Sequence, residues 1–109
     1  PRNLGRMARR AVLGLARTGS FISNGSGDFV IAFSTKNRKP YAPSTGSGQV
    51  ELLYNDAMNP MFLATVESVE EAVYNSLLKA TSVRGRAGHT SEALPIDRLR
   101  QMIDERGRN

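Results

Sequence analysis

Apolar and polar positions recur with two periods along the chain, and these periods predict its elements. Between residues 3 and 17, apolar side chains return at helical spacing while most arginines fall between them, which predicts a helix packed on one face. Gly5 and Gly14 would weaken an isolated helix, so we expect both to approach a neighbouring element closely, with the helix lying on a sheet. Gly19 follows the helix and can take the left-handed cap position.

Two shorter segments have the composition of β-strands. Residues 29–35, FVIAFST, form a nearly unbroken run of β-forming and small apolar residues, which is typical of a central strand covered on both faces. Residues 49–55, QVELLYN, alternate apolar and polar side chains, as a short edge strand would. The segment between them, 35–48, is rich in proline, glycine and basic residues and is predicted to be an exposed loop.

The region after residue 58 is predicted to be mainly helical. Asn59-Pro60 has the N-cap and first-turn proline of a helix start. The sequence SVEE at 68–71 has the spacing of a capping box. One or two helices are therefore expected to cover 60–81.

The end of the chain contains a predicted loop, a predicted helix and the single histidine. Residues 82–95 are interrupted by glycines and are predicted to be a loop. A final helix is expected to start at Pro95. His89 lies in the loop, without a nucleophile motif beside it, and we expect it to bond to backbone rather than to act as a general base.

Length and composition exclude several classes of protein and site. A chain of 109 residues fits a single domain, and it has no apolar run of the roughly 20 residues that a membrane helix needs. The absence of cysteine excludes disulfides, thiolate metal sites and a cysteine nucleophile. No signal peptide is evident, so cytoplasmic and periplasmic locations are both open.

The net charge of +5 is concentrated in the first part of the chain. Residues 1–39 hold eight lysines and arginines against one acid, whereas residues 40–109 hold seven against nine. Such a basic surface is either the solvated face of a helix or a surface for nonspecific nucleic-acid binding. The few aromatic residues do not alternate with the basic ones, which argues against base stacking.

One polar stretch directly before the predicted central strand is the candidate site. Glycines let its backbone take positive φ and come close to a partner, while a hydroxyl and a carboxylate two residues apart can point the same way. A carboxylate there can bind an amine or raise its pKa, although a plain turn would have the same composition. The stretch lacks the lysine and the flanking elements of a phosphate-binding loop, and no metal-ligand spacing occurs. Its residues are Asn24, Gly25, Ser26, Gly27 and Asp28.

Several motifs in the same order resemble one family over nearly the whole chain. The segment RMARRAVLGLARTGSFISNGSGDFVIAFST, followed by EEAVYNSLLKAT, GRAGH and EALP, resembles the self-processing aminopeptidases. These include the L-aminopeptidase D-Ala-esterase/amidases and the β-peptidyl aminopeptidases. The combination of ARTGS, SNGSGD and AFST is far more specific than any single glycine motif.

The resemblance implies a fold and an assembly. The family's fold is a four-layer α/β/β/α sandwich like that of N-terminal nucleophile hydrolases, and its precursor cuts itself into a large and a small subunit. Residues 1–109 resemble the small subunit, so we expect them to form the C-terminal portion of a single α/β domain that the large subunit completes. Higher homo-oligomers of such heterodimers are also implied, with neither nucleic acid nor membrane as a partner.

The resemblance also implies a reaction and its residues. An N-terminal serine, exposed by self-cleavage, would release N-terminal amino acids from short peptides, amides or esters, with no cofactor or metal. The family's serine and acidic residue near the nucleophile fall on Ser26 and Asp28, with Asn24, Gly25 and Gly27 in the site loop. The sequence starts at Pro1, inside the expected connection, so we expect the nucleophile to lie upstream. A related self-processing acyltransferase and a basic nucleic-acid-binding domain are the alternatives.

Overall fold

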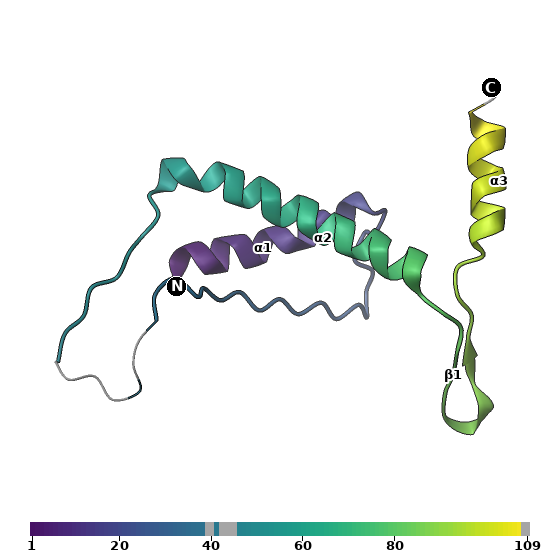
Figure 1. Ribbon diagram of the computed structural model, residues 1–109, viewed down its shortest axis with the longest axis horizontal. Coiled ribbons are helices and arrows are strands. Elements are labelled where there is room, and N and C mark those ends of the chain that lie inside the picture. The colour runs from purple at the N-terminus through teal and green to yellow at the C-terminus, as the bar shows by residue number, and fades with distance from the viewer. Residues whose placement is uncertain (39–40, 42–45, 108–109) are drawn as a thin grey trace. The chain divides into compact units, whose positions relative to one another are not determined.

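The computed structural model describes residues 1–38, 41 and 46–107 and divides into two compact units. The first, Pro1–Glu70, contains helix α1 (Arg2–Arg17), a 3₁₀ turn (Asn55–Met58) and the first part of helix α2 (Asn59–Lys79), as Figure 1 shows. The second, Glu71–Asn109, contains the end of α2, strands β1 (Val83–Arg84) and β2 (Thr90–Ser91), and helix α3 (Ile96–Arg106).

Helix α1 crosses α2 at Gly14, where the two backbones come into direct contact. A Cβ atom at Gly14 would lie 2.8 Å from Cβ of Val69 and closer still to the carbonyl oxygen of Val66. Real Cβ atoms do not approach this closely, so only glycine fits the crossing. The predicted close approach is confirmed at Gly14, but the neighbour is a helix rather than a sheet. No such approach occurs at Gly5 within the described residues, where nothing lies within 4 Å of a Cβ position.

The buried apolar residues of the first unit lie between α1 and the start of α2. Ala11, Met58 and Phe62 are the buried hydrophobic side chains among the described residues. The guanidinium of Arg10 lies 3.5 Å from the centroid of the Phe62 ring, and that of Arg6 lies 4.7 Å from it. Arginine stacks well on an aromatic face because its flat cation is weakly hydrated. Part of the basic face of α1 is therefore packed against the core.

Other arginines of α1 connect the helix to the residues before and within α2. Arg2 and Arg6 both donate to Oδ1 of Asn55, at 3.1 and 2.9 Å. Arg17 forms an ion pair of 3.1 Å with Glu70. These contacts support the interpretation of the basic residues as a helix face rather than as a nucleic-acid surface.

Helix α2 is one continuous helix from Asn59 to Lys79. The predicted start at Asn59-Pro60 is confirmed, but Ser68 lies inside the helix and begins no second one. A capping box needs a chain that enters the helix from an extended conformation. Here the preceding turns already supply hydrogen-bonded neighbours, so the serine continues the helix instead.

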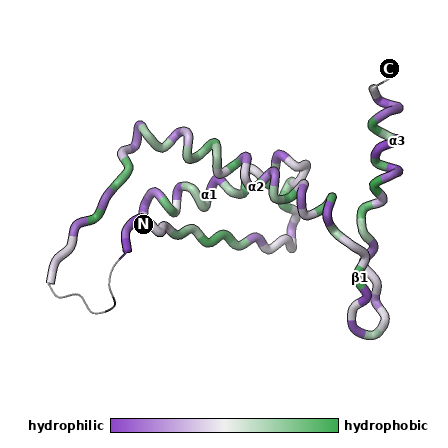
Figure 2. The backbone as a smooth tube through the Cα atoms, in the orientation of Figure 1, coloured by the Kyte–Doolittle hydropathy of each residue, from purple (hydrophilic) through white to green (hydrophobic). Residues whose placement is uncertain are grey.

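The two predicted strands at 29–35 and 49–55 are not formed in this chain. Neither segment has strand hydrogen bonding, and the one sheet among the described residues pairs β1 with β2. Residues 27–34 are nevertheless extended, and 29–33 among them are apolar, as the green stretch running alongside α1 in Figure 2 shows. A strand needs a neighbouring backbone to accept and donate its hydrogen bonds, and the described part of the chain offers none at this segment.

Side chains of the extended segment alternate in exposure. Phe29, Ile31 and Phe33 are 95%, 88% and 79% exposed, whereas Val30 is 44% exposed and Ala32 is only partly exposed. This alternation has the period of two that a strand imposes. The segment is thus strand-like in conformation, with its larger apolar face uncovered.

Asn37, two residues after the first predicted strand, binds the second predicted strand at Glu51. Its side-chain amide donates to the carbonyl oxygen of Glu51 and accepts from the backbone N–H of Glu51, both at 2.9 Å. Lys36 adds an ion pair of 3.2 Å to the Glu51 carboxylate. The predicted loop 35–48 has no helix or strand in its described residues, and its residues 39–40 and 42–45 lie outside the description.

The second unit contains a short hairpin where the sequence predicted only a loop. Val83 pairs with Ser91 and Arg84 with Thr90 in an antiparallel ladder. Ala87 and Gly88 form the turn, with φ of 57° and 80°. Two successive left-handed residues define the hairpin turn that matches strand twist, but the usual Asn-Gly sequence is missing here, which is why the pattern did not reveal it.

Helix α3 begins at Ile96 after Pro95, as predicted. Its apolar side chains are only partly covered within the described residues, because Met102 and Ile103 are more than half exposed. None of the described helices combines the length and the apolar character that crossing a bilayer requires.

Candidate active-site loop

The candidate site lies on the loop that leaves the end of α1. Thr18 closes the helix by donating from Oγ1 to the carbonyl oxygen of Leu15 at 2.7 Å. Gly19 has φ of 97°, and its N–H donates to the carbonyl oxygen of Ala16. The predicted left-handed cap is thereby confirmed, and it turns the chain away from the helix axis.

A second reversal forms the turn that carries Ser26. The backbone N–H of Ser26 donates to the carbonyl oxygen of Ser23 at 3.0 Å, and Gly25 has φ of 91°. A β-turn with a left-handed third residue favours glycine at that position, because a Cβ there would clash with the backbone. Gly25 is therefore required by the turn.

The structure brings Ser26 and Asp28 together as predicted. Oγ of Ser26 donates a hydrogen bond of 3.0 Å to Oδ2 of Asp28. Both residues are exposed, so a further group can reach either side chain from solvent. Since a hydroxyl carries one proton and two lone pairs, a Ser26 that donates to Asp28 keeps its oxygen free to accept from another donor.

Asn24 and Gly27, the other two predicted site residues, make no specific contact among the described residues. Asn24 is exposed, and its side chain makes no hydrogen bond to the described residues. Gly27 has neither a positive φ nor a close neighbour, because the nearest atom to its Cβ position is Cε2 of Phe29 at 3.8 Å. No close approach to Gly27 occurs among the residues that the structure describes.

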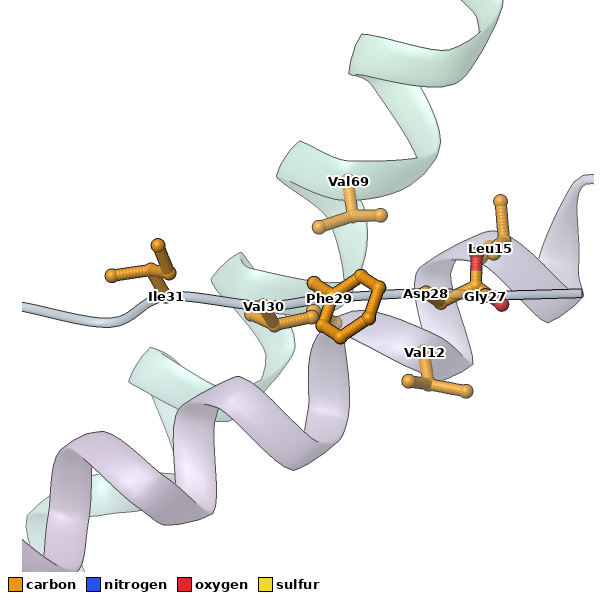
Figure 3. A pocket seen from close by; sticks show the side chains of 9 residues that line it. Val12, Leu15, Gly27, Asp28, Phe29, Val30, Ile31 and Val69 are labelled. Carbon is orange, nitrogen blue, oxygen red and sulfur yellow. The ribbon is translucent and has the colours of Figure 1, made fainter.

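An open apolar hollow adjoins Asp28. Figure 3 shows it where the extended segment passes α1 and α2, with Val12, Leu15 and Val69 around it. Asp28 supplies the one charged side chain of the lining. The complete set is Ala11, Val12, Leu15, Gly27, Asp28, Phe29, Val30, Ile31 and Val69.

Ile22 is a feature of the loop that sequence reasoning missed. Its φ is 54°, in the left-handed region, which β-branched residues rarely adopt. Its N–H donates to Oγ of Ser20 at 3.3 Å. Nothing in the letters FISNG marks isoleucine for this conformation, because left-handed positions are usually predicted from glycine or asparagine.

The single histidine lies in the second unit, in the hairpin. The backbone of His89 donates to the carbonyl oxygen of Arg86 and accepts from the N–H of Gly85, at 3.3 and 2.7 Å. It thus closes the hairpin turn through its own backbone groups, and the described residues show no hydrogen bond from its imidazole to backbone, so the expected side-chain bond is not confirmed. Among the residues that the structure describes, no three His, Cys, Asp or Glu side chains gather in a group that could hold a metal ion.

Comparison with known proteins identifies the wider family. Residues 1–91 match the family model of Peptidase family S58. The chain is 38% identical over 103 residues to the β-peptidyl aminopeptidase BapA of Sphingosinicella microcystinivorans, covering 94% of this chain and 26% of that protein. It is 34% identical over 110 residues to BapA of Sphingosinicella xenopeptidilytica, covering 97% of this chain and 27% of the relative. The chain thus spans about a quarter of the length of these relatives.

Two solved structures have similar folds. The PH0078 protein of Pyrococcus horikoshii matches with a TM-score of 0.86 and 43% identity, over 97% of this chain and 30% of that one. The L-aminopeptidase D-Ala-esterase/amidase of Ochrobactrum anthropi matches with a TM-score of 0.85 and 38% identity, over 99% and 31%. The latter is described as a prototype for the serine aminopeptidases and a new variant among the Ntn hydrolase fold. Since the family model covers most of its residues, the chain belongs to Peptidase family S58.

Proposed function

We propose that the protein containing this chain is a serine aminopeptidase whose N-terminal serine nucleophile is produced by self-cleavage. The observation that carries the proposal is the hydrogen bond of 3.0 Å from Ser26 to Asp28 at an exposed turn, in a chain of Peptidase family S58. The names of the relatives support the reaction class, since they are β-peptidyl aminopeptidases and an L-aminopeptidase D-Ala-esterase/amidase. The substrates are short peptides, amino-acid amides or esters.

The nucleophile of this reaction is supplied by a segment upstream of Pro1. An N-terminal serine carries its own base, because a free α-amine has a pKa of about 7.7–8.0 and is partly neutral near pH 7.5. The serine oxygen attacks the scissile carbonyl carbon while its proton passes to the α-amine. The resulting ammonium then protonates the leaving amine as the C–N bond breaks, leaving an ester on the serine. Water hydrolyses this ester and releases the amino acid.

Ser26 and Asp28 assist the proton transfer. Because the Ser26 hydroxyl donates to Asp28, its oxygen can accept from the nucleophile's hydroxyl or from the ammonium group. The Asp28 carboxylate stabilises the ammonium by Coulomb attraction and so raises the pKa of the α-amine. Asn24 and Gly25 shape the turn, and Gly27 leads it into the extended segment.

The remaining part of the protein is the proposed partner of this chain. Extended residues 27–34 have no backbone partners in the part of the chain that the structure describes, and Phe29, Ile31 and Phe33 expose most of their surface. We propose that the backbone groups pair with strands of the large subunit and that the exposed side chains pack on a second sheet. The chain would then form the small-subunit portion of one four-layer α/β/β/α domain, and the heterodimers would assemble into a higher oligomer.

Kinetics of the full-length protein test the assignment of Ser26. The Ser26→Ala variant is expected to hydrolyse amino-acid p-nitroanilides about 100-fold more slowly, within the range for losing one acid–base group. Ser23→Ala is the matched control, because the turn uses only the Ser23 backbone carbonyl, and it should keep wild-type kcat. Equal rates for Ser26→Ala and wild type would contradict the proposed role.

The same assay separates hydrolysis from acyl transfer. Hydrolysis predicts free amino acid as the main product even when a competing amine is added, whereas a self-processing acyltransferase would transfer the acyl group to that amine. A metal chelator should leave the rate unchanged, because the proposed proton transfers use only side chains and the α-amine.

A further inference from the structure

Two residues of the site loop that follows the helix cap at Gly19 have left-handed backbone conformations. Gly25 has φ of 91° and Ile22 has φ of 54°. Glycine adopts this region freely, whereas isoleucine does so only when its surroundings hold it there. The site loop is thus bent at Ile22, before the Ser26 turn, and at Gly25, within that turn.

The surroundings of Ile22 show what holds it. Its N–H is bound by Oγ of Ser20 at 3.3 Å. Its side chain is 38% exposed, against 87% for the adjacent Phe21, so Ile22 is exposed, though less so than its neighbour. The hydrogen bond from its N–H is the restraint that the structure shows at this position.

Ile22 directly precedes the turn that carries the site. Ser23 follows it and accepts the hydrogen bond from the Ser26 N–H, and Ser26 in turn donates to Asp28. A rotation of the backbone at Ile22 would move the hydrogen-bonded turn and the Ser26–Asp28 pair together. The backbone conformation at Ile22 therefore contributes to the direction in which Ser26 and Asp28 face.

We propose that Ile22 is a positioning residue, which holds the Ser26–Asp28 pair in the orientation that the proposed serine aminopeptidase reaction uses. This inference rests on the proposed function and adds a residue that touches neither substrate nor nucleophile. Backbone strain that the surroundings maintain is found at sites where a catalytic group must be preorganised. Small misplacements of such groups cost large factors in rate.

The test compares three variants of the full-length, self-processed protein. Ile22→Gly allows the same φ but removes the β-branched side chain and widens the conformations open to the loop. It is expected to lower kcat about tenfold, while KM and the Tm of the assembled protein change little. Ile22→Val keeps the β-branched side chain and should restore kcat to within about twofold. Ala87→Gly is the matched control, since Ala87 is the other left-handed non-glycine residue described, and it should leave kcat unchanged.

The outcomes separate this inference from the proposed function. A wild-type protein that hydrolyses no amino-acid amide or peptide overturns both. An active wild type with an equally active Ile22→Gly variant overturns only the role of Ile22. If Ile22→Gly does not fold, Ser20→Ala decides, because it removes only the acceptor for the Ile22 N–H. A reduced kcat with unchanged KM then supports the inference, and wild-type kcat overturns it.

Discussion

The hydroxyl of Ser26 and the carboxylate of Asp28 form the smallest unit of the proposed chemistry. Their 3.0 Å hydrogen bond joins residues two apart across Gly27, so it depends on local backbone and little on the rest of the fold. This is why the sequence sufficed to predict the pair. The left-handed Ile22 was not predictable in the same way, because its conformation depends on packing that no local pattern reports.

Removing the charge of Asp28 should change the pH dependence of the reaction. Asp28→Asn keeps an oxygen that can accept from Ser26 but has no negative charge to stabilise an ammonium. The pKa of the N-terminal amine should therefore fall. Since the neutral amine is the active base, the acid limb of kcat/KM should move to lower pH, by about half a unit or more. The measurement is the pH profile of kcat/KM for wild type and variant, and an acid limb that stays in place would contradict the role of Asp28.

At the scale of elements, the α1–α2 crossing is the contact that fixes the start of the site loop. Gly14 permits the approach to Val66 and Val69, and Arg17 binds Glu70 where the loop begins. Local sequence signals predicted both helices, the close approach of Gly14 and the start of α3: apolar periodicity for α1, the proline and capping positions for α2 and α3, and low helix propensity for Gly14. These signals did not predict which element α1 packs against, because that element lies far away in the sequence and leaves no mark on the local pattern.

A methyl group at the crossing should destabilise the protein. Gly14→Ala places a Cβ against the Val66 carbonyl and Val69, and overpacking of this kind costs about 1–3 kcal/mol. Gly5→Ala is the matched control on the same helix, because its Cβ position is open and alanine is the better helix former by up to about 1 kcal/mol. Denaturant unfolding of the assembled protein measures both variants. A Gly14→Ala protein as stable as wild type would show that the helices do not cross as described.

At the scale of the whole molecule, the described residues bury few apolar side chains and leave many large ones exposed. Only Ala11, Met58 and Phe62 are buried hydrophobic residues within the described part. The predicted strands have the right composition and alternation, yet their backbone partners are absent from the described residues. Strand pairing joins segments distant in sequence, so the pattern at 29–35 could indicate a strand without supplying its neighbour.

A charge on the uncovered face should disrupt the proposed assembly. Ile31 is 88% exposed in this chain, and burying an unpaired lysine at its position against a second sheet would be strongly unfavourable. Ile31→Lys is expected to prevent the two subunits from copurifying, whereas Ile31→Val should leave the assembly intact. Size-exclusion chromatography of the coexpressed product measures this. An Ile31→Lys protein with unchanged size and subunit content would contradict a covered face.

The most direct test of the central claim is the mass of the mature chains. The complete reading frame should be expressed, and the purified protein analysed by denaturing intact-mass measurement and N-terminal sequencing. The account predicts two chains, of which the smaller begins with serine a short distance upstream of Pro1. A single uncut chain, in a preparation that is folded and assembled, would contradict a serine nucleophile generated by self-cleavage.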